Sequence, residues 1–75
     1  MNNSIQKIIN KMHNQPNGIR PEEAEKVLEN AGYVFDRQKG SHKNFLHTKT
    51  GDVITIKVES PLKAVYIKDI LKRIE

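Results

Sequence analysis

The sequence contains no cysteine and no tryptophan, and its aromatic residues are limited to two Tyr and two Phe. Without cysteine the chain forms no disulfide and no thiolate metal site, and this absence fits a reducing compartment. No apolar run approaches the roughly 18 residues that a membrane-spanning helix requires. The start, residues 1–4, lacks the basic and then apolar pattern of a signal peptide. We therefore expect a cytoplasmic protein that does not bind membranes.

Positive charge is in excess, and it is concentrated in the second half of the chain. The 75 residues, enough for one small domain with a thin core, carry a formal net charge of +4 at pH 7. Residues 1–36 have a net charge of −1, whereas residues 37–75 have a net charge of +5. This asymmetry favours a polyanionic partner, although a solvated basic face is common on small proteins.

Three segments have the apolar spacing of amphipathic helices. The first ends at the Asn-Gln-Pro-Asn-Gly loop of residues 14–18. The second begins at Pro21, which suits the first helical position, and ends before Gly32, a natural C-terminal cap. The third is the tail of the chain, and it begins either at residues 60–61 or near Ala64.

Three strand candidates lie between the second and third helices, at residues 33–39, 43–48 and 53–58. A Thr-Gly-Asp sequence at residues 50–52 predicts a hairpin turn between the last two. We therefore predict an α+β fold in the order α, α, β, β, β, α, with a three-stranded antiparallel sheet that carries helices on one face.

The apolar pattern assigns the faces of the third strand but leaves those of the second open. Ile54 and Ile56 share one face of the third strand, which we expect to pack against the helices. In the second strand, Phe45 and Leu46 point to opposite faces, so the pattern does not decide which of them is buried. The face on which His47 lies stays open for the same reason.

His42 follows a Gly-Ser pair and stands between cationic side chains in the segment 37–43. An imidazole titrates near neutral pH and cations attract phosphate, so this segment suits chemistry on RNA. The imidazole could take the proton of a ribose 2′-hydroxyl or protonate the leaving 5′-oxygen. The alternative is a solvated loop histidine in a surface charge run, since short motifs match by accident. The residues expected to contact RNA are Arg37, Lys39, Gly40, Ser41, Lys43 and, on the third helix, Lys68.

Other kinds of site find little support in the sequence. Histidines at positions 13, 42 and 47 do not have a recognisable metal-ligand spacing, so we expect no metal and no cofactor. No glycine-rich phosphate loop followed by Lys and Ser or Thr is present, which argues against a nucleotide-hydrolysing enzyme. The sequence leaves three candidates for the general acid that would complement His42, namely a lysine, His47 and water.

Four groups of residues, taken together, are more specific than the Gly-Ser-His sequence alone. They are the segment at residues 27–33, which ends in Gly-Tyr, the Arg-Gln-Lys-Gly-Ser-His segment at 37–42, Phe45 with His47, and the basic helical segment at 66–72. Through this pattern the chain resembles the HicA family of toxin proteins over roughly residues 20–75.

The resemblance implies a double-stranded-RNA-binding-like α-β-β-β-α fold. Residues 1–75 would form a single domain, with residues 1–18 as a helical extension to a core of residues 20–75. The resemblance also implies ribosome-independent cleavage of mRNA, with His42 as the catalytic histidine. We expect this cleavage to be metal-independent. A HicB-type antitoxin would be the protein partner, and the protein would reach DNA only through that complex. The rival hypotheses are a non-catalytic RNA-binding module and an interaction protein that docks an acidic antitoxin.

Overall fold

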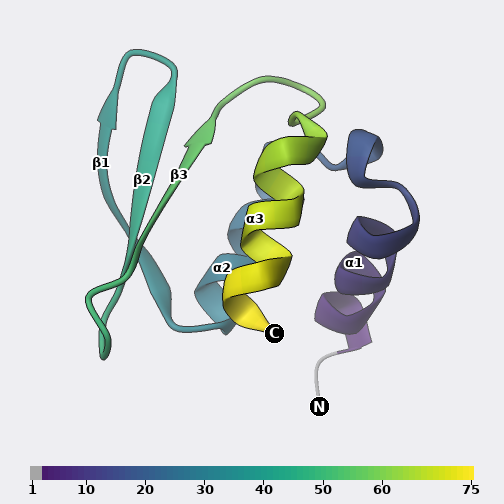
Figure 1. The fold of residues 1–75 in the computed structure, drawn as a ribbon, viewed down its shortest axis with the longest axis horizontal. Helices are drawn as coiled ribbons and strands as arrows, with labels where there is room; N and C mark the ends of the chain where they lie inside the picture. The colour runs from purple at the N-terminus through teal and green to yellow at the C-terminus, as the bar shows by residue number, and fades with distance from the viewer. Residues whose placement is uncertain (1–2) are drawn as a thin grey trace.

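The computed structural model describes residues 3–75, which form a three-stranded antiparallel sheet covered on one face by two helices, with the N-terminal helix packed against those two helices (Figure 1). The elements are α1 (Asn3–Asn14), the short 3-10 helix η1 (Pro16–Gly18), α2 (Pro21–Asn30), β1 (Tyr33–Lys39), β2 (His42–His47), β3 (Val53–Lys57) and α3 (Ala64–Ile74). The predicted α+β fold, with the order α-β-β-β-α after an N-terminal helix, is confirmed. Residues 1 and 2 of the predicted extension lie outside the described residues.

Every strand begins and ends within one residue of its predicted position. The structure also decides where α3 starts. This helix begins at Ala64, as the second of the two alternatives proposed. The preceding loop is held by Leu62, whose side chain is buried and whose backbone N–H donates to the carbonyl of Ile19 at 2.8 Å. Because burial and this hydrogen bond fix Leu62 in the loop, α3 begins after it, at Ala64.

The sheet contributes Phe45, Ile54 and Ile56 to the core, and all three side chains are buried. The expected packing of Ile54 and Ile56 against the helices is confirmed. Of Phe45 and Leu46, between which the sequence pattern did not decide, Phe45 is the buried residue. Leu46 therefore lies on the face of the sheet opposite the helices, here called the open face. The central strand β2, flanked by β1 and β3, therefore has one face toward the helices and one toward solvent.

Helix α1 packs into the same core as the rest of the fold. Ile8 and Met12 belong to the buried cluster that includes the sheet residues. Lys11 Nζ also lies 3.1 Å from a carboxylate oxygen of Glu23 in α2. The other oxygen of Glu23 accepts the backbone N–H of Arg20 at 3.0 Å, and this bond chiefly lowers the pKa of Glu23. The carboxylate of Glu23 thus links α1 to the start of α2.

We predict that Ile56→Val lowers the free energy of unfolding by about 1 kcal/mol, because it removes one buried methylene from a filled core. Urea denaturation followed by circular dichroism measures the change. The matched control is Val65→Ala on the exposed face of α3, where the side chain is 65% exposed. The control should change stability by less than about 0.5 kcal/mol. Equal effects of the two substitutions would contradict the described core.

Candidate functional site

The two ends of β2 each carry a histidine, and the two side chains lie far apart. His42 begins the strand beside the β1–β2 turn, and His47 ends it beside the β2–β3 turn (Figure 1). A strand advances about 3.3 Å per residue, so the two positions are separated by roughly 17 Å. The two histidines are therefore too far apart to contact the same chemical group.

His42 lies on the open face of the sheet. It is an odd number of residues from the buried Phe45, so the alternation of β2 points it away from the helices. Its direct neighbours in the sheet are Lys39 of β1 and Lys57 of β3. Its side chain is exposed, and within residues 3–75 no hydrogen bond or ion pair engages the imidazole. The ring is consequently accessible and flanked by two positive charges.

A β-bulge at Asp36 determines which basic residues of β1 share this face. Phe35 pairs with Phe45, but the next pair is Arg37 with Asn44, so Asp36 is an extra residue in β1. Without the bulge, strict alternation from Tyr33 would turn Arg37 toward the helices. With it, Arg37 and Lys39 lie on the open face beside His42.

The β1–β2 turn is formed by Gly40 and Ser41, next to His42. Gly40 has a positive φ of 60°, which glycine adopts without steric cost, and a Cβ there would meet no atom within 4 Å. The carbonyl of Ser41 accepts the backbone N–H of Val58 at 2.6 Å. This bond joins the turn to the end of β3, so the two segments next to His42 are held together.

The two remaining basic residues that the sequence singled out lie elsewhere. Lys43 points to the helix side, where its Nζ is 3.0 Å from a carboxylate oxygen of Glu25 and 5.4 Å from the centre of the Phe35 ring. Lys68 is exposed on α3, next to the buried Ile67. The structure therefore brings Arg37 and Lys39 together with His42 on one face and places Lys43 on the other.

Three open-face residues were absent from the set predicted to contact RNA. Lys57 pairs with His42 across the sheet, and Asn44 pairs with Thr55. The hydroxyl of Thr55 donates to Oδ1 of Asn44 at 2.7 Å. Alternation along β3 is sufficient to place Thr55 and Lys57 opposite to Ile54 and Ile56. Only the register shows that Lys57 stands beside His42.

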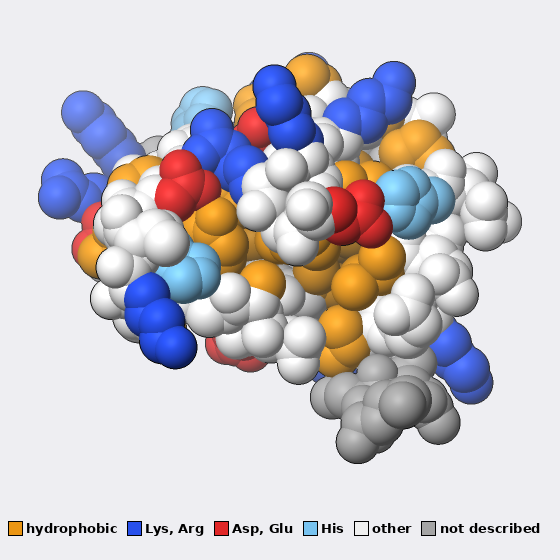
Figure 2. Space-filling model, turned by 60° about the horizontal axis from the view of Figure 1, so that its bottom comes forward, with side chains coloured by type: hydrophobic (Ala, Val, Ile, Leu, Met, Phe, Trp, Pro, Cys, Tyr) orange, Lys and Arg blue, Asp and Glu red, His pale blue; other side chains and the backbone are white. Residues whose placement is uncertain are grey.

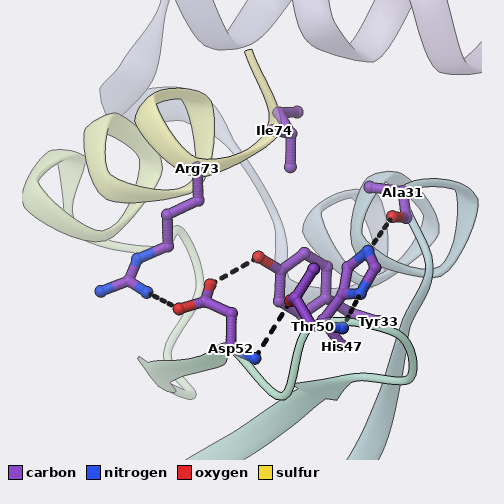
Figure 3. Close-up of a pocket in the computed structure, with 7 residues that line it drawn as sticks. All are labelled: Ala31, Tyr33, His47, Thr50, Asp52, Arg73 and Ile74. Carbon is purple, nitrogen blue, oxygen red and sulfur yellow. Dashed lines mark hydrogen bonds and ion pairs between the residues drawn. The ribbon is translucent and has the colours of Figure 1, made fainter.

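The other end of the sheet contains a cavity of about 400 Å³ (Figure 3). Figure 2 turns this end toward the viewer and shows hydrophobic side chains exposed between charged and polar ones. The cavity is lined by Ala31, Tyr33, His47, Thr50, Asp52, Arg73 and Ile74.

Asp52 connects two elements across this cavity. It accepts the hydroxyl of Tyr33 at 2.6 Å and forms an ion pair with Arg73 of α3. Arg73 also pairs with Asp69 one turn earlier. Burial and the bond to Asp52 raise the pKa of Tyr33 to about 12. The same bond, together with Arg73, lowers the pKa of Asp52.

The ring of His47 is occupied by structural hydrogen bonds. Its Nδ1 accepts the backbone N–H groups of Lys49 and Thr50 at 3.1 and 3.2 Å, which leaves Nε2 to donate to the carbonyl of Ala31 at 3.1 Å. Gly32 makes room for the ring, because a Cβ there would lie 2.9 Å from Nε2. His47 therefore attaches the β2–β3 turn to the end of α2.

Neither a metal-binding cluster nor a membrane-spanning helix is found among residues 3–75. No group of three or more His, Asp or Glu side chains in this range is arranged to hold a metal ion. No helix in the described part of the chain has the length and apolar composition needed to cross a membrane.

Most of the chain matches a known protein family. A protein-family model described as "HicA toxin of bacterial toxin-antitoxin" matches residues 21–75. The chain belongs to the HicA toxin family. The match begins at the first residue of α2, so α1 precedes the part that the HicA family shares. No curated protein and no solved structure matches the chain significantly. Membership in HicA implies a toxin that acts with an antitoxin partner.

The ion pair at the cavity predicts a pH dependence of stability. Because the folded state lowers the pKa of Asp52 below its ordinary value of 3.8, the carboxylate stabilises the fold above that pH. This contribution is lost as the pH falls through the lowered pKa. We predict that Asp52→Asn reduces the free energy of unfolding at pH 7, and that the difference from the parent shrinks below about pH 4.

Urea denaturation at pH 7, 4 and 2.5 would measure this difference. Asp36→Asn is the matched control, since the Asp36 carboxylate pairs only with the neighbouring Arg37 among the described residues. A deficit of Asp52→Asn that stays constant over the whole pH range would contradict the role of the carboxylate.

Proposed function

We propose that this HicA toxin is a ribosome-independent endoribonuclease that cleaves mRNA on the open face of its sheet, with His42 as the catalytic group. The observation that supports this most strongly is the position of the His42 imidazole. It is exposed, free of internal hydrogen bonds within residues 3–75, and flanked by Lys39 and Lys57. The ring of His47, by contrast, is occupied by hydrogen bonds on both nitrogens.

The reaction that fits this arrangement is transfer of a phosphodiester within the RNA strand. The ribose 2′-oxygen forms a bond to phosphorus, the bond from phosphorus to the 5′-oxygen breaks, and the products are a 2′,3′-cyclic phosphate and a 5′-hydroxyl. One proton leaves the 2′-hydroxyl and one reaches the 5′-oxygen. His42 transfers one of these two protons.

The cations beside His42 would bind the phosphate. Arg37 and Lys39 share its face, and positive charge there stabilises the additional negative charge of the transition state. Gly40 and Ser41 leave the turn open to the RNA backbone. We also assign RNA contacts to Lys43 and Lys68. For Lys43, such a contact requires its ammonium to leave Glu25.

Family membership supports a proposal for the partner and the setting. We propose a HicB-type antitoxin as the inhibitor, cytoplasmic mRNA as the substrate, and DNA contact only through the toxin–antitoxin complex. No cofactor and no metal enters the proposed reaction. We further propose that residues 1–75 act as one domain in which residues 1–18 extend a core of residues 20–75.

We predict that His42→Ala lowers the cleavage rate of a long unstructured RNA by at least about 100-fold, because removing an acid–base group typically costs this much or more. The rates are measured with purified protein, by gel, with a chelator present throughout. His13→Ala is the matched control, since His13 is exposed on α1 and pairs with Glu75 rather than lying on the open face. The control should cleave like the parent.

Other outcomes would select a different hypothesis. RNA binding by both proteins without cleavage would replace the catalytic hypothesis with a non-catalytic RNA-binding module. Absence of RNA binding even at low salt would favour an interaction protein, because phosphate contacts strengthen as salt falls. Cleavage that disappears only in the chelator would contradict the metal-independent mechanism.

A further inference from the structure

Lys57 occupies a fixed position directly beside His42. It is the last residue of β3 and pairs with His42, and the register between β2 and β3 is regular over all five of their pairs. The preceding residue, Ile56, is fully buried toward the helices. Alternation therefore turns Lys57 to the open face, on which His42 also lies.

Glu59 is the acidic residue next to the ammonium of Lys57. The Nζ of Lys57 lies 3.7 Å from Oε2 of Glu59, an ion pair that is too long for a hydrogen bond. The same oxygen is buried and accepts no hydrogen bond from the described residues. The side chains of Lys57 and Glu59 are 42% and 33% exposed, and the carboxylate attracts the ammonium. The backbone bond from Val58 to Ser41 fixes the chain between the two residues.

The other cations near the site are less well placed to act on a phosphate beside His42. Lys43 lies on the opposite face and is bound to Glu25. Arg37 pairs across the sheet with Asn44 rather than with His42, and its side chain is 75% exposed. Lys39 also neighbours His42, but among residues 3–75 it has no ion pair that would hold its side chain. Of the two direct neighbours of His42, Lys57 is the one that has an ion pair among residues 3–75.

We infer that Lys57, held by Glu59, binds the non-bridging oxygens of the scissile phosphate while His42 transfers a proton. This inference rests on the proposed function and adds a second catalytic residue to it. Lys57 acts by charge alone, so no proton leaves it during the reaction. The negative charge on these oxygens grows toward the transition state, so a cation already in position accelerates the chemical step more than it strengthens binding.

The test compares Lys57→Ala, Lys57→Arg and the control Lys49→Ala in single-turnover cleavage of one RNA. Lys49 lies in the β2–β3 turn at the other end of the sheet. Affinity is measured separately with a 2′-O-methyl version of that RNA, which has no 2′-hydroxyl to attack. Circular dichroism shows whether each variant is folded.

We expect Lys57→Ala to lower the cleavage rate by about 100-fold, as loss of a transition-state donor does. Affinity for the 2′-O-methyl RNA should fall by less than about fivefold, since one phosphate contact contributes only modestly to binding. Lys57→Arg retains the charge and should recover most of the rate. Lys49→Ala should match the parent in both measurements.

Glu59→Gln provides a second test of the same arrangement. As a positioning residue, Glu59 should affect the rate only through Lys57. Its substitution should slow the parent but cause no further loss in the Lys57→Ala background. Additive losses in the double variant would show that Glu59 acts independently and would overturn this part of the inference.

The remaining outcomes separate this inference from the proposed function. If the parent cleaves and Lys57→Ala cleaves equally fast, Lys57 has no role, while the His42 mechanism stands. If Lys57→Ala loses affinity but keeps its maximal rate, Lys57 only binds RNA and the inference is overturned. If the parent and the Lys49→Ala control both fail to cleave, the proposed function fails, and the role of Lys57 fails with it.

Discussion

Burial of Phe45 in the centre of the sheet is the constraint on which the other arrangements depend. Side chains alternate along a strand, so a one-residue slip of β2 would exchange its two faces. With Phe45 packed on the helices, Lys43 and His47 are directed toward α2 and bind Glu25 and Ala31 there. His42 is directed to solvent by the same constraint. His42 is thus exposed because an aromatic side chain three residues away is buried.

The two ends of the sheet consequently have different properties. At the far end, side chains satisfy one another: Asp52 binds Tyr33 and Arg73, and the ring of His47 is occupied on both nitrogens. At the end with His42, positive charges gather around an imidazole that has no internal partner within residues 3–75. The first end contributes to the stability of the fold, and the second exposes an imidazole beside Lys39 and Lys57.

Local patterns in the sequence were sufficient to predict the helices and strands. Which residues meet at the site depends on the register in which the strands pair. Helical periodicity, Pro21 and Gly32 predicted the helices, and alternation in β3 predicted its buried face. Periodicity could not choose between Phe45 and Leu46, because both are apolar and adjacent. The bulge at Asp36 has no signature in the sequence, although it turns Arg37 to the open face. The proximity of Lys57 to His42 depends on strand pairing, which local patterns do not specify.

The most direct test of the account is to map where RNA binds on the protein. Backbone amide resonances of the His42→Ala variant would be followed by NMR during titration with an uncleaved, unstructured RNA. The account predicts shift changes concentrated at residues 37–44 and 55–59, with little change around the cavity at Asp52. Changes concentrated at that cavity or on the outer surface of α1, with the open face of the sheet unaffected, would contradict it.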